Sequence, residues 1–266
     1  MTGATERAHQ SDWVDRIATI GLVAFGLVHV VIGWLAVQLA FGDREGGAST
    51  TGAVKQLAEQ PFGGVLVWFV AIGMVLLAAW QAIEAAVGHS QEDDAKRWRK
   101  RALSAGKTVV YAVIASSAVS VATGSASSGG DTDSMTATLM DRPGGQLLVG
   151  GVGLGVIAVG VGLVVVAYRE SYLKKLDGDG RSGATGTAYR WLGRGGYLAK
   201  GIALGVVGSL FLYAAATHEP DKSGGLDQAL QKVLDQPFGP VLLAAIGLGF
   251  AAYGLFCFAQ ARYLDR

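Results

Sequence analysis

Six long apolar segments alternate with short polar segments along the chain. Each is long enough to cross the hydrocarbon core of a bilayer, which takes roughly 20 apolar residues in a helix. A soluble helical core is disfavoured, because no amphipathic helices remain to cover six such segments. The pattern predicts an all-α fold, a polytopic membrane protein with six transmembrane helices. These helices are expected over residues 17–41, 62–87, 102–123, 144–168, 195–217 and 238–261.

A proline-glycine turn recurs three times and divides the chain into three units. Proline suits the first turn of a helix, where the backbone N–H groups have no intrahelical acceptor. Each turn follows a short polar segment that is expected to form a helix, over residues 51–59, 134–141 and 226–235. Each unit therefore reads as one spanning helix, an external loop with a short helix, and a second spanning helix. The turns are Gln60-Pro61-Phe62-Gly63, Arg142-Pro143-Gly144-Gly145 and Gln236-Pro237-Phe238-Gly239.

Glycines at recurring positions support these three units. Each unit starts near a glycine (Gly21, Gly106 and Gly196) that lies 40, 37 and 41 residues before the proline. In the second helix, Gly73, Gly155 and Gly249 all lie 12 residues after the proline. Two spans per unit make all three units face the same way, a parallel repeat with its axis along the membrane normal. The expected boundaries are a tail over 1–15, units over 16–89, 102–172 and 193–266, and links over 90–101 and 173–192.

The third unit resembles the domain of unknown function 1206 family. The resemblance rests on Gly193-Arg194-Gly195-Gly196-Tyr197-Leu198-Ala199-Lys200-Gly201, followed by the loop, Gln-Pro-Phe-Gly and a glycine-rich helix. It covers roughly residues 16–264, although unit two departs at Ala105-Gly106-Lys107 and Arg142-Pro143-Gly144. It implies a six-helix membrane protein with three such repeats, of a mostly actinobacterial type. It implies no activity.

Composition and charge agree with a membrane protein and indicate its orientation. Hydrophobic residues make up 51% and charged residues only 16%, where a soluble domain carries about 25% charged residues. The net charge of +1 gives no reason to expect nucleic acid as a partner. Fifteen Lys and Arg lie on the side that holds both termini, against five on the other side. By the positive-inside rule, both termini are expected in the cytoplasm, with the chain in the plasma membrane.

One basic cluster dominates that charge asymmetry. Its simplest interpretation is a topology signal that contacts anionic lipid headgroups. A docking site for an acidic partner or for one specific lipid headgroup is the alternative. The cluster consists of Lys96, Arg97, Arg99, Lys100 and Arg101.

Four ionisable residues lie inside the expected spans, namely His29, Glu84, Lys107 and Lys200. Such groups are functional candidates, because burying them in a membrane is costly. His29 lies roughly 18 Å from the inner end of its helix, and structural hydrogen bonding, a proton or substrate site and cofactor ligation all remain open for it. Lys107 and Lys200 lie near cytoplasmic ends and can extend to the interface. Glu84 lies at a similar depth, where an ion pair with either lysine would lower the cost of burial.

Glycine pairs are expected to pack the helices, because lipid offers no hydrophobic drive for their association. Gly151 with Gly155, and Gly201 with Gly205, have the four-residue spacing that brings two small residues onto one helix face.

No catalytic constellation and no His/Cys cluster with metal-ligand spacing is evident, so we expect no enzyme, cofactor or metal. The first hypothesis is a non-enzymatic membrane scaffold or accessory subunit that binds another membrane protein or a second copy. The alternative is a small-solute or ion conduit with a site near His29, in a cavity lined by residues such as Tyr111, Ser117 and Tyr253.

Overall fold

The fold is built from helices, six of which are long. The computed structural model describes residues 2–42, 48–88, 93–125, 131–175 and 183–263. Each of the six long helices contains a stretch that is apolar and long enough to cross a membrane. The structure confirms the predicted all-α class. They are α1 (Thr2–Ala40), α3 (Gly63–Ala86), α4 (Asp94–Ala122), α6 (Gly145–Arg169), α8 (Gly183–Thr217) and α10 (Gly239–Arg262).

Shorter helices occupy the connections. The predicted loop helices of the three units are α2 (Thr50–Ala58), α5 (Asp131–Met140) and α9 (Leu226–Leu234). Two short 3-10 helices, η1 (Ser171–Lys175) and η2 (Pro220–Lys222), follow α6 and α8. Three spanning helices begin earlier than their apolar segments, since α1, α4 and α8 extend into the expected tail and links. Parts of the expected tail, links and unit ends lie outside the described residues, namely residues 1, 89–92, 176–182 and 264–266.

Each proline turn is a left-handed turn that requires a glycine. The residue after the proline has a positive φ of 64° at Phe62, 78° at Gly144 and 61° at Phe238. The chain then turns so sharply that a Cβ on the next residue would lie closer than 3.0 Å to a backbone carbonyl of the preceding short helix. Only glycine fits there, which explains why the turn recurs with glycine at its last position. These three glycines are Gly63, Gly145 and Gly239.

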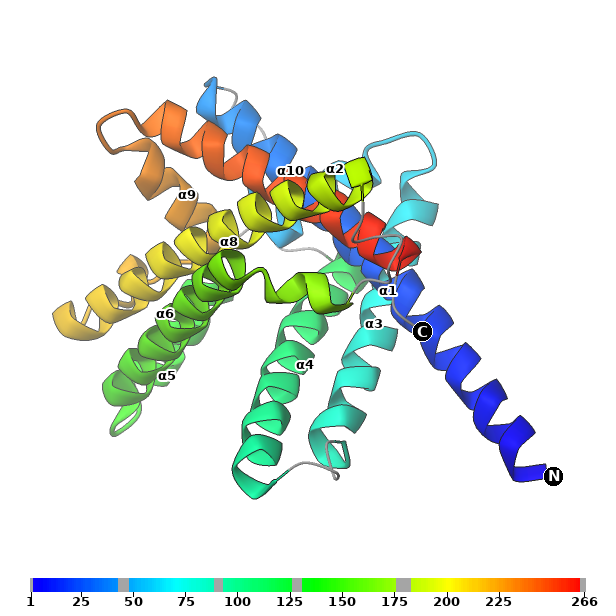
Figure 1. The fold of residues 1–266 in the computed structure, drawn as a ribbon. Helices are drawn as coiled ribbons and strands as arrows, with labels where there is room; N and C mark the ends of the chain where they lie inside the picture. The colour runs from blue at the N-terminus through cyan, green and yellow to red at the C-terminus, as the bar shows by residue number, and fades with distance from the viewer. Residues whose placement is uncertain (1, 43–47, 89–92, 126–130, 176–182, 264–266) are drawn as a thin grey trace.

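The six long helices form an open row in the order α4, α3, α1, α10, α8, α6 (Figure 1). The most extensive contacts are between α3 and α4, α1 and α10, and α6 and α8, and each joins the second helix of one unit to the first helix of another. Contacts within a unit, between α1 and α3 and between α8 and α10, are smaller. The two helices of unit two, α4 and α6, stand at opposite ends of the row and do not pack along each other in the described part of the chain.

Glycines allow two of these pairs to approach closely. A Cβ added at Gly33 would lie 2.5 Å from the Gly247 carbonyl oxygen of α10. In the pair of α6 and α8, a Cβ at Gly160 would lie 2.7 Å from the Gly201 oxygen, and one at Gly153 would lie 2.9 Å from the Gly208 oxygen. The contacting glycines are therefore seven residues apart along α6 and along α8.

The predicted four-residue spacing of packing glycines was wrong. Added Cβ atoms at Gly151, Gly155 and Gly205 would meet nothing within 4 Å. Two helices that cross at a small angle keep the same face in contact about every seven residues. Of the predicted glycines, Gly201 makes the contact.

Candidate intramembrane polar site

His29 lies on the buried face of α1 and has a defined tautomer. Its side chain is only 5% exposed, and its Nδ1 lies 2.8 Å from the carbonyl oxygen of Phe25, one helical turn earlier. A carbonyl oxygen only accepts hydrogen bonds, so the Nδ1–H of the imidazole donates this one. The Nε2 lone pair is therefore available to a donor from another helix.

Lys200 of α8 supplies that donor. Its Nζ lies 3.0 Å from His29 Nε2, across 171 residues of sequence. The same ammonium lies 4.8 Å from the centre of the Phe25 ring and 4.0 Å from the centre of the Tyr253 ring. Aromatic faces attract a cation through their quadrupole, so both rings stabilise the charged form of the lysine. The first helices of units one and three thus meet at one polar contact.

Aromatic side chains from three helices surround this pair. The His29 ring contacts Phe25, Phe250 and Tyr253, with ring centres 4.2, 6.0 and 5.0 Å away. Tyr111 of α4 meets Phe25 edge-on at 5.3 Å. Tyr111 and Tyr253, both expected near His29, therefore lie at this site.

Ser117, the other residue expected near His29, has a different role. It accepts a 3.3 Å hydrogen bond from the Thr51 hydroxyl and joins α4 to α2.

The Lys200 ammonium has no anionic partner in the described part of the chain. One of its three N–H groups donates to His29, and no other described residue offers it a hydrogen-bond acceptor or a carboxylate within ion-pair distance. Lys200 is half-buried, and a cation in such a position is costly unless an anion or a proton acceptor compensates it. Chemically, the arrangement can hold a small anion or share a proton between the amine and the imidazole.

The other two intramembrane candidates lie elsewhere. Glu84 is half-buried near the end of α3, and its carboxylate lies against Gly88. Lys107 is exposed on α4. The ion pair considered between Glu84 and Lys200 is not formed among the described residues, because the Lys200 ammonium is held by His29. A pair between Glu84 and Lys107 stays a prediction.

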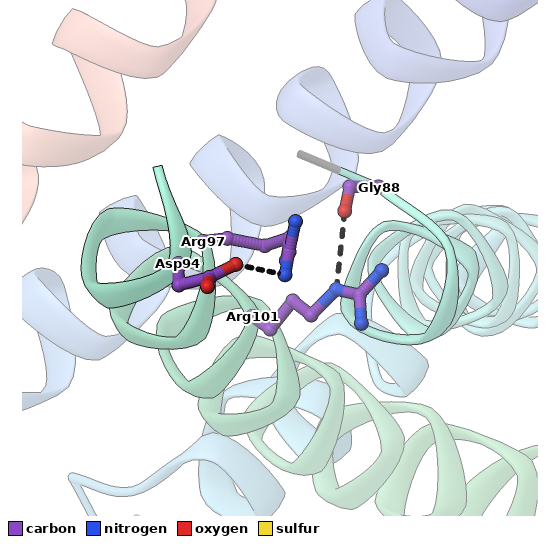
Figure 2. A network of polar contacts seen from close by, with 4 residues as sticks. All are labelled: Gly88, Asp94, Arg97 and Arg101. Atoms are coloured by element: carbon purple, nitrogen blue, oxygen red, sulfur yellow. Dashed lines mark hydrogen bonds and ion pairs between the residues drawn. The ribbon is translucent and has the colours of Figure 1, made fainter. Parts of the chain in front are cut away.

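The basic cluster lies on the first turns of α4, and some of its side chains bind partners within the chain (Figure 2). Arg97 pairs with Asp94, and Lys96 lies 3.9 Å from Asp93. Arg101 donates from Nε to the carbonyl oxygen of Gly88, 3.1 Å away, just beyond the end of α3. This last bond satisfies a carbonyl near a helix end and joins α3 to α4. Binding of anionic headgroups by the cluster stays a prediction.

A second aromatic cluster was not found from the sequence. Tyr172 of η1 packs against Tyr197 of α8 and Phe256 of α10, and its hydroxyl donates to the Arg190 carbonyl oxygen at 2.8 Å. Gly193 makes room for it, because a Cβ there would overlap the Tyr172 ring. Burial raises the pKa of the Tyr172 phenol above its ordinary value. The tyrosines were scattered over a polar link and two helices, so no local pattern marked them.

The sequence did contain a signal for the contact between His29 and Lys200. Aligning Gly21 with Gly196 places Lys200 at the position of Phe25, one helical turn before His29. Two residues on matching faces of matching helices, at nearly the same depth, are well placed to meet in a parallel repeat.

The fold and its interior site define a multi-pass helical membrane protein built from three two-helix repeats. The chain belongs to the family described as Domain of Unknown Function (DUF1206), which matches it over residues 20–88, 103–170 and 195–264. These three matches confirm the three units, and they begin one residue before Gly21 and Gly196 but three residues before Gly106. Gly106 therefore lies deeper in its unit than the glycines it was paired with.

One curated relative resembles nearly the whole chain. It is the Uncharacterized protein YxxB of Bacillus subtilis (strain 168), which is 27% identical over 252 residues, covering 94% of this chain and 91% of that protein. No solved structure matches the chain.

Proposed function

We propose that this protein is a membrane conduit for a small anion, with its site at Lys200 and His29. The observation that carries the proposal is the half-buried Lys200 ammonium within the helical bundle, which is held only by neutral groups among the residues that the structure describes. Ionisable groups in such places are rare outside substrate and ion pathways. An anion next to Lys200 would occupy the two N–H groups that His29 leaves unused.

Anion flux into liposomes tests this function. The purified chain is reconstituted, and the uptake of chloride, nitrate and formate is followed with a potassium gradient and valinomycin. We expect uptake above that of protein-free liposomes for at least one of these anions. We expect Lys200→Met to lose it, because the substitution keeps the length of the side chain and removes the charge.

Lys107→Met is the matched control, since Lys107 is an exposed lysine in the first helix of another unit. It should retain the flux of the wild type. Equal flux through wild-type and Lys200→Met liposomes would refute the proposal, as would the absence of flux from a folded wild-type protein.

A non-enzymatic scaffold or accessory subunit is the second candidate. The observation in its favour is the large apolar surface that α4 and α6 leave unpacked, including Val113 and Leu154, which are both exposed. A photo-crosslinking residue at Leu154 should give one defined protein adduct, whereas the same residue at the exposed Ile72 of α3 should label lipid. Lipid labelling alone from both positions would count against a scaffold.

For either function we propose a plasma-membrane protein with both termini in the cytoplasm. The proposal rests on the fifteen Lys and Arg of the terminal side against five opposite. Reporter fusions at the C-terminus should be active only if the reporter functions in the cytoplasm. Activity of a periplasmic or extracellular reporter there would reverse the orientation.

A further inference from the structure

Units one and three each contain the same interface between their own two helices. In unit one, a Cβ at Gly21 would meet the Leu77 side chain, and a Cβ at Gly73 would lie 2.8 Å from the Ala24 methyl group. In unit three, Gly196 meets Tyr253, and Gly249 meets Ala199. The first helix thus contributes two small residues three apart, and the second helix contributes a glycine and, four residues later, a larger side chain.

Unit two carries the same positions. Gly106-Lys107-Thr108 aligns with Ala199-Lys200-Gly201, which places Leu103 and Gly106 where Gly196 and Ala199 stand in unit three. With this alignment, the first of these positions lies 40, 40 and 41 residues before the prolines of the three units. On α6, Gly155 and Val159 lie 12 and 16 residues after the proline, as Gly249 and Tyr253 do.

In unit two, however, these surfaces are largely open in the part of the chain that the structure describes. Cβ atoms added at Gly106 and Gly155 would find no atom within 4 Å. Leu103 is 57% exposed and Val159 is 52% exposed. Leu77, which is the equivalent of Val159 in unit one, is only 5% exposed. An interface that is made twice in this molecule is therefore split into two halves in unit two.

The short loop helices show the same split. In units one and three, α2 packs against α1 and α9 packs against α8, so each contacts the first helix of its own unit. In unit two, α5 instead packs against α6 and η2. The separation of α4 from its unit thus extends into the external loop.

We infer that α4 and α6 are complementary docking surfaces, and that the chain has a second conformation in which they bind each other and close the row into a ring of six helices. The occupant of each surface is the other helix of the same chain. The two helices are linked through residues 123–144, so each is held at a high effective concentration near the other. Close approach through Gly106 and Gly155 would favour their association in lipid.

Closure would act on both sides of the polar pair. Tyr111, which contacts Phe25 beside His29, belongs to α4, and α6 packs along α8, which carries Lys200. A movement that brings α4 to α6 therefore displaces either α4, which touches the site, or α6, which packs on the helix that carries Lys200.

Cysteine crosslinking tests the closed conformation directly. Leu103→Cys and Val159→Cys are combined in a Cys257→Ser background and oxidised with copper phenanthroline in membranes. Leu103 and Val159 are equivalent to the contacting pairs Gly21 with Leu77 and Gly196 with Tyr253, so we expect a disulfide within one chain, detected as faster migration of the monomer on non-reducing gels.

Ala105→Cys with Val159→Cys is the matched control, because residue 105 lies on another face of α4; it should react several-fold less. A second arm adds Gly155→Leu to the test pair. The open conformation has room for this side chain, so the protein should fold, but the bulk should block closure and abolish the crosslink. A product of twice the monomer mass would mean that a second copy occupies these surfaces, and no crosslink at all would mean that they do not dock; either result overturns the inference.

Discussion

The Lys200 ammonium is stabilised by neutral acceptors, namely one imidazole nitrogen and two aromatic faces. Such a charge depends on each of them, because an ammonium in an apolar bundle that loses a partner is left with an uncompensated cost of desolvation. His29 in turn depends on the Phe25 carbonyl, which fixes the proton on Nδ1. The two residues should therefore behave as one energetic unit.

A double-mutant cycle measures this coupling. His29→Phe removes the acceptor and leaves the ammonium unpaired, so we expect a loss of about 1–3 kcal/mol in the free energy of unfolding. Adding Lys200→Met should cost little further or should restore part of the loss. Unfolding in mixed detergent micelles gives the four free energies, and purely additive effects would contradict a direct interaction.

Asp227 lies on α9, outside the membrane-spanning helices, and should make the stability of the protein depend on pH. Burial raises the pKa of this carboxyl, an effect that a hydrogen bond from the Ala48 backbone opposes. A raised pKa means that the fold disfavours the ionised form. Stability is therefore highest below the unfolded pKa and falls as the pH rises through the folded pKa. Thermal unfolding of Asp227→Asn should show a higher Tm than the wild type at neutral pH and no difference in acid.

The exposed Asp235, which follows α9, provides the control. Asp235→Asn should change the Tm little at either pH. A wild-type advantage over Asp227→Asn at neutral pH would contradict the assigned burial effect.

Among the elements, α6 shows most clearly which face of a glycine-rich helix packs against its neighbour. Gly160 lies against the Gly201 carbonyl of α8, whereas Gly151 on the same helix faces open space. The sequence could not distinguish these glycines, because glycines are spread around α6 and do not form a single row of small residues along one face. The seven-residue contact period became evident only from the crossing of α6 and α8.

Substitution of these two glycines should have opposite effects. Gly160→Ala places a methyl group 2.7 Å from the Gly201 oxygen, and we expect this overpacking to cost about 1–3 kcal/mol. Gly151→Ala should be neutral or stabilising by up to about 1 kcal/mol, because alanine favours helix. Unfolding in detergent compares them, and equal stability of the two variants would refute the observed packing of α6 on α8.

Arg101 joins two elements, since its Nε donates to the Gly88 carbonyl beyond the end of α3. Arg101→Ala should cost about 0.5–1.5 kcal/mol and should speed hydrogen exchange in the last turn of α3. Arg99→Ala is the control, because Arg99 is exposed and lies two residues before Arg101 in the same cluster. Equal exchange rates in the two variants would show that the bond does not stabilise this helix end.

At the scale of the whole molecule, the sequence correctly predicted six long apolar helices, the proline turns and a threefold repeat. The length and hydropathy of the apolar segments predicted the spanning helices, and the proline turns predicted the three units. It could not predict that unit two is split, because contacts between helices in lipid depend on shape at single small residues such as Gly106 and Gly155. It found His29 and Lys200 separately but not together, because their contact spans 171 residues.

The central claim is that the interior ammonium of Lys200 binds a small anion. A ligand that binds only the folded state raises the Tm with its concentration. The most direct test is therefore the Tm of the detergent-solubilised protein as chloride, nitrate or formate replaces gluconate at constant ionic strength. The account predicts that the Tm rises with at least one of these anions for the wild type and for Lys107→Met, and stays constant for Lys200→Met. The same rise in all three proteins, or no rise in any, would contradict it.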